Sequence, residues 1–238
     1  MIGTGTLVNA AAIVIGSSIG LLLGHKLPAR IQSTLIKIAS LTTIGIGMQM
    51  FLEMKYILIV LPSLIVGAVI GETLKIENRV EQLGSWMKKI VRSKSETFLE
   101  GFVTTSILYC VGPMAILGAL ADGLSGQHNI LFTKSILDGT VSISFAAAWG
   151  AGVAFSAVPI LIYQGLLTVV GILLGHFFSA LMIRELTATG GLLMIAIGLN
   201  VLGVFEKDKK IPLGNLLPAI LLAPLAAWAY EALTVFLK

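Results

Sequence analysis

Long apolar stretches recur along almost the whole chain. Each is about 20 residues long, the length that an α-helix needs to cross the hydrocarbon core of a bilayer. In lipid a spanning segment must satisfy its own backbone groups, so these stretches predict an all-α membrane protein. We expect eight spans, at residues 5–24, 31–51, 56–74, 98–121, 132–156, 158–181, 186–205 and 213–236.

The composition requires lipid as the solvent. Of the 238 residues, 56% are hydrophobic and 12% are charged, and the mean hydropathy is +0.97. An ordinary soluble domain carries about 25% charged residues, so this chain has too few polar groups to cover an apolar interior. The formal charge of +4 is assigned to topology and to contact with anionic lipid, because no soluble module is present to bind nucleic acid.

The sequence contains an internal repeat. Residues 20–51 align with 171–202 at an offset of 151, without gaps and with 11 identities in 32 positions. The first span corresponds to the sixth and therefore crosses in the opposite direction, so the repeat is predicted to be inverted. Inverted repeats are typical of transporters, although duplication can also simply build a stable bundle. The expected organisation is one membrane domain, with repeat A at 1–74, a connection at 75–97, a central helix pair at 98–156 and repeat B at 157–238.

Basic residues are distributed unevenly between the two sets of connections. Eleven lysines and arginines fall on one set and four on the other. Short basic loops stay in the cytoplasm, which places the N-terminus and the C-terminus outside. Within the 75–97 connection, Ile76, Val80, Leu83 and Met87 recur at helical spacing. We expect this segment to be an amphipathic helix on the inner leaflet.

The two central spans carry sequence features that are unusual in a membrane helix. Gly112 and Pro113 fall near the middle of span 98–121, where proline removes a backbone donor and breaks the helix. Span 132–156 carries Ser142, Ser144 and Trp149 and ends in a glycine-rich segment, so it is a candidate for a broken or re-entrant span. These features predict a passage for a solute, while the alternative is a plain proline kink with small-residue packing.

Acidic residues sharpen this hypothesis. Asp138 lies inside span 132–156, with Lys134 four residues earlier on the same helical face. An intramembrane carboxylate indicates a functional site, although this pair also fits an ion pair in the outer leaflet. Asp122 closes the preceding span on the same side.

Amides occupy equivalent positions in the two repeats. Gln49 and Asn200 follow the matched glycines, and each amide can bind a polar solute or cross-link helices. Asn9, Tyr163 and Gln164 are further polar residues inside spans. The candidate passage residues are Gly112, Pro113, Asp138, Ser142, Ser144, Trp149, Gln49 and Asn200.

Several segments together resemble the YdfK/YqgA-like family of bacterial inner-membrane proteins. They are residues 3–9 with Gly16 and Gly20, the central 134–139, and 152–156 followed by 163–165. The resemblance covers nearly the whole chain and implies a multi-spanning helical fold in the bacterial cytoplasmic membrane. Because that family is functionally uncharacterised, it transfers no catalytic or binding residue.

The expected function is that of a secondary transporter or permease for a small polar or ionic solute, working by alternating access. An ion channel is the main alternative. An intramembrane serine protease is suggested by the run from Gly123 to Gly126, with His176 expected on the same outer side as its partner. Ser125, however, precedes a polar turn instead of starting a helix. No enzyme activity, cofactor or metal site is predicted. The expected partners are the lipid bilayer and the solute; nucleic acid is excluded, and assembly as a homo-oligomer is left open.

Overall fold

The structure is a computed structural model that describes residues 2–24, 27–174, 177–206 and 209–236. Within these ranges every regular element is a helix, as predicted. The paired histidines of the repeat, at positions 25 and 176, lie outside the described residues. The helices are α1 (Thr4–Gly24), α2 (Ala29–Phe51), α3 (Ile57–Leu74), α4 (Ile76–Ile90), α5 (Phe98–Cys110), α6 (Pro113–Ser125), α7 (Asn129–Trp149), α8 (Gly152–Phe155), α9 (Ala157–Leu174), α10 (Ala180–Leu202), η3 (Gly214–Leu216) and α11 (Leu217–Phe236).

Seven segments of the described chain are long and apolar enough to cross a membrane, and the bent pair α5 and α6 would make an eighth. The prediction of about eight spans is confirmed at this level. Three predicted boundaries are wrong by six or seven residues, one of them the end of span 158–181, because α9 ends at Leu174 and residue 181 belongs to α10. The helix α10 begins at Ala180 instead of 186, because the Ser179 hydroxyl accepts the backbone N–H of Met182 and caps the helix start. The helix α7 ends at Trp149 instead of 156, where Gly150 takes φ +81°.

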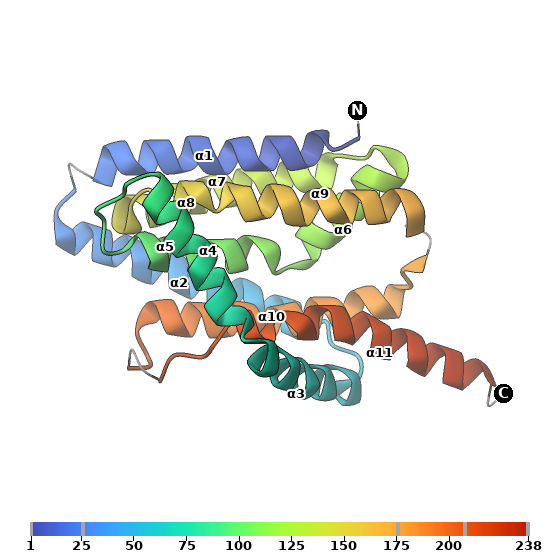
Figure 1. Cartoon of the computed structure of the whole chain (residues 1–238). Coiled ribbons are helices and arrows are strands. Elements are labelled where there is room, and N and C mark those ends of the chain that lie inside the picture. Colours follow the sequence, from blue (N-terminus) through green and yellow to red (C-terminus); the bar gives the residue numbers. More distant parts are fainter. Residues whose placement is uncertain (1, 25–26, 175–176, 207–208, 237–238) are drawn as a thin grey trace.

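The helices form two groups that lie side by side (Figure 1). In one group α1 packs on α7 and α6 on α9; in the other α2 packs on α10 and α3 on α11. Residues 91–97 and the described parts of 203–213 lie at one end of the bundle, hereafter the basic end (Figure 1). The start of α1 and the end of α11 lie at the opposite end, hereafter the terminal end.

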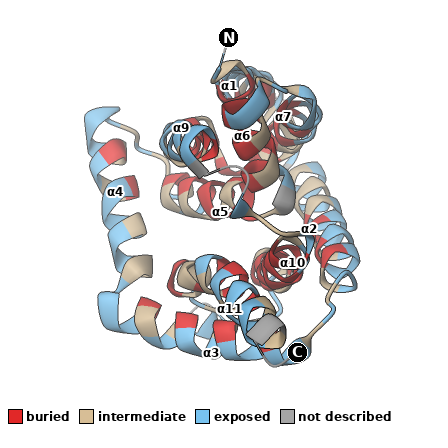
Figure 2. Cartoon of the chain, turned by 90° about the vertical axis from the view of Figure 1, so that its right-hand side faces the viewer, coloured by how far each residue is buried: buried red, intermediate tan, exposed pale blue. Residues whose placement is uncertain are grey.

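Burial divides the helices into an enclosed centre and a lipid-facing shell. Of the 18-residue apolar stretch within α10, 72% is buried, against 22% of the corresponding stretch in α2 and 28% in α3. Figure 2 shows α10 coloured mainly as buried and surrounded by exposed outer faces. Large apolar side chains such as Leu22, Leu58 and Leu173 point outward, as expected where lipid replaces water.

Small residues bring α1 and α7 into backbone contact. A methyl group added at Gly16 would lie 2.1 Å from the carbonyl oxygen of Gly139, and one added at Gly20 would lie 2.3 Å from that of Ile143. Gly24 approaches the Ala147 carbonyl in the same way, at 2.5 Å. Membrane helices approach this closely only where side chains are absent, so these glycines fix the register of α1 on α7.

The predicted amphipathic connection is the helix α4, which crosses the molecule beside the two groups (Figure 2). Gly84 and Met87 are buried, and a methyl group at Gly84 would lie 2.7 Å from the Phe102 ring of α5. Trp86 is exposed. The helix therefore packs on the bundle through one face and presents an aromatic side chain on another, the pattern of an interfacial helix.

The predicted break at Gly112 and Pro113 is present. The helices α5 and α6 meet at 58°, and Gly112 takes φ +137°, a conformation that only glycine adopts readily. Pro113 has no N–H to donate to the carbonyl of Tyr109 one turn earlier. The second suspected break lies between α7 and α9, where the short helix α8 continues into the next span, so α7 itself is an unbroken helix of 21 residues.

Candidate functional site within the helix bundle

A charged pair occupies the middle of α7. Asp138 is the tenth of the 21 residues of this helix, because α7 starts at Asn129, three residues before the predicted span. The ammonium group of Lys134, one turn earlier, forms an ion pair with the Asp138 carboxylate. Both side chains are buried, with 7% and 11% of their surface exposed. Asp138 therefore lies further into its helix than the predicted start at residue 132 implies.

Side chains from three helices meet at this pair. The Tyr109 hydroxyl of α5 is 2.7 Å from the hydroxyl of Ser142 on α7, and the Lys134 ammonium lies 5.6 Å from the centre of the Tyr109 ring. The amide of Asn9 on α1 lies near the Asp138 carboxylate, but neither of its polar atoms forms a hydrogen bond among the described residues. We call these five residues, Asn9, Tyr109, Lys134, Asp138 and Ser142, the central polar site.

The helix break adjoins the central polar site. Tyr109 and Cys110 are the last two residues of α5, directly before the Gly112 turn. Cys110 lies close enough to Lys134 and Asp138 for their charges to act on its thiol, and Tyr163 of α9 lies near Cys110. The last turn of α5, directly before the break, therefore lies near the charged pair, while Gly112 itself lies beside Gly190 of α10.

Further polar groups are buried without a partner among the described residues. The side chains of Thr6, Ser17, Ser106 and Gln164 are at least nine-tenths buried, and their hydroxyl or amide atoms form no protein hydrogen bond there. An unsatisfied polar group in an apolar medium costs several kcal/mol. Water or a polar solute inside the bundle would remove this cost.

Two other buried carboxylates lie at the terminal end and act on helix starts. The two oxygens of Asp122 on α6 accept the N–H groups of Gly3 and Gly5, each at 3.1 Å, and one also contacts His128 at 3.0 Å. Glu185 of α10 accepts the N–H groups that lead into α3, from Lys55 at 3.1 Å and Tyr56 at 2.9 Å. A negative group is favourable at the positive end of a helix, so both carboxylates stabilise structure.

The remaining predicted residues have different surroundings. Trp149 stacks on Phe145 with ring centres 4.7 Å apart, and its carbonyl accepts the Thr97 hydroxyl, so it packs between helices. Ser144 is half-buried on α7.

Gln49 is exposed on the outer face of α2, whereas the Asn200 side chain forms hydrogen bonds with the backbone N–H and carbonyl of Ile211. The structure brings neither amide to the central polar site.

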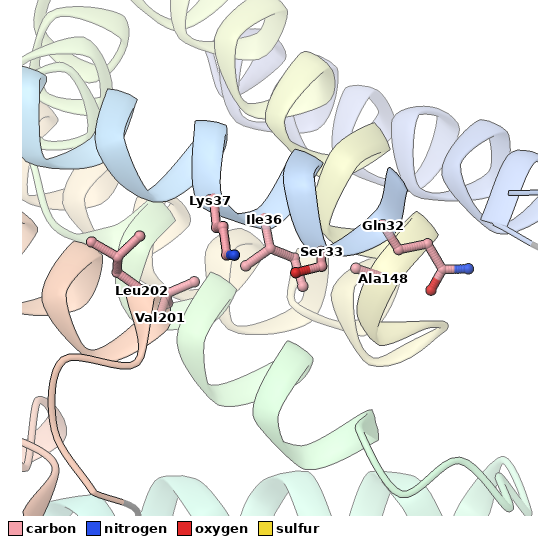
Figure 3. Close-up of a pocket in the computed structure, with 7 residues that line it drawn as sticks. All are labelled: Gln32, Ser33, Ile36, Lys37, Ala148, Val201 and Leu202. Atoms are coloured by element: carbon pink, nitrogen blue, oxygen red, sulfur yellow. The ribbon is translucent and has the colours of Figure 1, made fainter. Parts of the chain in front are cut away.

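Two hollows open at the basic end. The larger, of about 520 Å³, lies between α4, α5 and the end of α10, and we call it the acidic cavity. The smaller, of about 350 Å³, lies between α2, α7 and α10, and Figure 3 shows Lys37 and Ser33 projecting from α2 beside it. The charged residues that line the acidic cavity are Glu77, Glu81, Glu96, Glu100 and Lys210.

The acidic cavity is held together by contacts between distant segments. Lys210 forms an ion pair with Glu100 at 2.9 Å. Glu77 accepts the N–H of Gly214, while its own N–H donates to the Asn215 side chain at 2.8 Å. Burial raises the pKa of Glu77 above its ordinary value, and the Gly214 N–H opposes this rise. These contacts join the start of α4 and of α5 to the segment 210–215.

The protease hypothesis gains no geometric support from the described residues. Ser125 ends α6, and its hydroxyl donates to the Ala121 carbonyl at 3.1 Å. Gly126 closes the helix in a left-handed conformation, so the serine does not start a helix, and the suggested partner at position 176 lies outside the described residues.

The fold and the site define a polytopic α-helical membrane protein with a charged centre. The chain belongs to the DUF554 family, described as proteins of unknown function, whose profile matches residues 4–228. It is 32% identical to the uncharacterised protein YqgA of Escherichia coli K12, covering 94% of this chain and 97% of that protein. It is 28% identical to the uncharacterised membrane protein YdfK of Bacillus subtilis 168, covering 96% and 97%. No solved structure gives a significant match.

Proposed function

We propose that this protein is a secondary transporter of the bacterial cytoplasmic membrane that carries a small polar or ionic solute by alternating access. The observation that carries the proposal is the buried Lys134–Asp138 pair in the middle of a membrane-spanning helix, next to the broken helix pair α5 and α6. One charge at such a depth costs roughly 2.5–3.5 kcal/mol on insertion scales, and charges there generally mark a solute or ion pathway.

The unpartnered polar groups support a hydrated path through the bundle. Ser17 and Asn9 lie on the buried face of α1, Ser106 on α5 and Gln164 on α9, so these groups come from three helices in the same group as the charged pair. A merely structural ion pair would not account for these unsatisfied groups. A solute that exchanges its hydration shell for protein groups would use them.

Reciprocal packing supports an inverted repeat. Gly47 of α2 contacts the backbone of Gly191 in α10, and Gly198 of α10 contacts the backbone of Ser40 in α2. Adding the repeat offset of 151 to Gly47 gives Gly198, and adding it to Ser40 gives Gly191. The two contacts are therefore related by the same pseudo-twofold relation as the sequence repeat, which is the symmetry that lets two halves exchange conformations.

The two hollows indicate which state the structure represents. Both open at the basic end, which the basic loops assign to the cytoplasm. At the terminal end, Asp122 and Glu185 tie α6 to α1 and α10 to the start of α3. We therefore propose that this state is open toward the cytoplasm, with the N-terminus outside.

Cysteine accessibility tests the proposal. Ser142→Cys in a Cys110→Ala background places one thiol in the central polar site, and a charged methanethiosulfonate is applied separately to right-side-out and inverted vesicles. Alternating access predicts modification from both sides. The matched control is Thr140→Cys, two residues away on the lipid-exposed face of α7, which should react from neither side.

Each result has a defined meaning. Failure to react from either side overturns the transport proposal and leaves the pair as a structural element. Reaction from one side alone also contradicts alternating access. If the thiol reacts from both sides and the protein conducts single-channel currents in planar bilayers, the ion-channel alternative replaces the carrier.

A further inference from the structure

We propose that a monovalent cation binds at the Asp138 carboxylate in competition with the Lys134 ammonium, so that the protein exchanges one cation for one proton. This inference rests on the transport function proposed above and specifies its solute. It follows from the donor atoms at the central polar site, from the charge balance of the pair and from the charge of the cavity beside it.

The groups around Asp138 suit a hard cation. Near the carboxylate lie the Tyr109 and Ser142 hydroxyls, which are 2.7 Å from each other, and the Asn9 amide. Carboxylate, hydroxyl and amide oxygens are the ligands that replace the water shell of such ions. In the structure the Lys134 ammonium is paired with the Asp138 carboxylate. A cation that binds this carboxylate must therefore take the place of the ammonium.

The charge balance fixes the exchange ratio. With Lys134 protonated and Asp138 ionised, the pair is neutral. A cation added to this pair would leave one uncompensated buried charge, which proteins avoid. The Lys134 N–H bond therefore breaks and the proton passes to water, while the nitrogen keeps the electron pair and the cation takes its place on the carboxylate. The pair stays neutral, and one proton leaves for each cation bound.

The acidic cavity selects for cations at the entrance. Four glutamates and one lysine line it, and Thr104 of α5 forms part of its wall. Tyr109 lies five residues further along the same helix, which is about 7–8 Å at the helical rise of about 1.5 Å per residue. A cavity lined mainly by one sign of charge concentrates ions of the opposite sign. An anion that sought Lys134 would have to enter against this field.

Other titratable groups near the pair are few among the described residues. The helix α5 contributes Tyr109 and Cys110, α9 contributes Tyr163 beside Cys110, and α1 contributes only the neutral Asn9.

The charged groups on the other helices that pack against α7 are held elsewhere. Asp122 on α6 contacts Gly3, Gly5 and His128. On α2, Lys37 lines the smaller hollow beside Ala148 at the end of α7, more than two turns beyond Asp138. Lys134 is therefore the group whose proton the exchange uses.

The test uses the full-length protein in liposomes that contain a pH-sensitive dye. External Na⁺, K⁺ or Li⁺ is added, with N-methylglucamine as the non-binding control. We expect at least one alkali cation to raise the internal pH as protons leave. Asp138→Asn should lose this response, whereas Thr140→Val on the lipid-exposed face should retain it.

Lys134→Gln separates coupling from binding. Without the ammonium, cation uptake measured with a radioactive tracer should persist but become electrogenic and independent of the pH gradient. If Lys134→Gln loses all uptake and elutes as aggregate in size-exclusion chromatography, a second measurement on another variant tests cation binding. In Ser142→Cys protein, the transported cation should slow methanethiosulfonate modification relative to N-methylglucamine.

The outcomes distinguish this inference from the proposed function. If Ser142→Cys reacts from both sides but no alkali cation moves protons or slows modification, the cation inference is overturned and the transport proposal stands. The cation inference is overturned in the same way if chloride or acetate, instead of a cation, drives the pH change. If Ser142→Cys reacts from neither side, the transport proposal itself fails.

Discussion

The carboxylates Asp122 and Asp138 are both buried in this bundle, yet they differ in what holds them. Asp122 accepts two backbone N–H groups from another helix, whereas Asp138 pairs with a lysine side chain on its own helix. Backbone donors are fixed in place, but a lysine side chain can move or lose its proton. Burial alone therefore does not tell whether a charge stabilises the fold or takes part in exchange. The mobility of the group that pairs with it makes this distinction.

The largest expected effect comes from breaking the exchangeable pair. Asp138→Leu leaves the Lys134 ammonium buried without a countercharge, which should lower the free energy of unfolding by about 3–5 kcal/mol. The double variant Lys134→Met with Asp138→Leu removes both charges and should recover most of this loss. Thermal melting in detergent, followed by size-exclusion chromatography, measures both variants. A double variant as unstable as the single one would show that the pair is structural.

Removing the Asp122 carboxylate should lower the free energy of unfolding somewhat less than removing Asp138. A second substitution should not restore the lost stability. Asp122→Leu removes the acceptor for Gly3 and Gly5. The part-buried Gly3 N–H can bond to water, whereas the buried Gly5 N–H stays unsatisfied, at a cost of about 1–3 kcal/mol. No side-chain substitution can remove these backbone donors. Adding His128→Leu should therefore restore little stability in the same melting assay, and full recovery would contradict the assignment of Asp122 as a cap.

A milder change sharpens the same comparison at the second cap. Glu185→Gln keeps one carbonyl oxygen for the Lys55 and Tyr56 N–H groups but removes the negative charge at the start of α3. The expected loss is about 1–2 kcal/mol, because a charge-assisted bond becomes a neutral one. The matched comparison is Glu53→Gln, an exposed carboxylate in the same loop, which should leave the melting temperature unchanged.

The smallest expected effect is a pH dependence at the basic end. Because the pKa of Glu77 is raised in the folded protein, the folded state binds this proton more readily than the unfolded state. Stability from this group is therefore present below the unfolded value of about 4.5 and decreases as pH rises through the higher folded pKa. Glu77→Gln should flatten the melting temperature between about pH 4 and about pH 7, whereas Glu96→Gln, at an exposed carboxylate of the same cavity, should retain the wild-type slope.

The sequence predicts the spans well because hydropathy is a local property. It also predicts the α5–α6 break and the Lys134–Asp138 pair, since Gly-Pro and an intramembrane charge are local signals. It places the start of α10 six residues late, because Ser179 determines that start through a single hydrogen bond. Helix ends depend on such individual caps, which hydropathy does not resolve.

Residues whose role depends on neighbouring helices are harder to predict. Tyr109 is missed because an aromatic residue in an apolar span is typical of the core, and only the packing of α5 on α7 places its hydroxyl on Ser142. Gln49 and Asn200 match in sequence, but α2 lies at the lipid surface while α10 is enclosed. Glu185 is missed as well, although a carboxylate just before a long apolar run is a signal for a buried helix cap.

The backbone at Gly112 has a kinetic consequence. No atom lies within 4 Å of a side chain added at this residue, whereas the α1–α7 interface is locked by glycines against carbonyls. The angle between α5 and α6 can therefore change at one uncrowded residue, as at hinges in other moving proteins, but α6 must carry α9 with it because Gly123 packs against the Thr168 carbonyl. The dwell time of each state would then be set by rotation of a single backbone unit, while α1 and α7 move together as one rigid body.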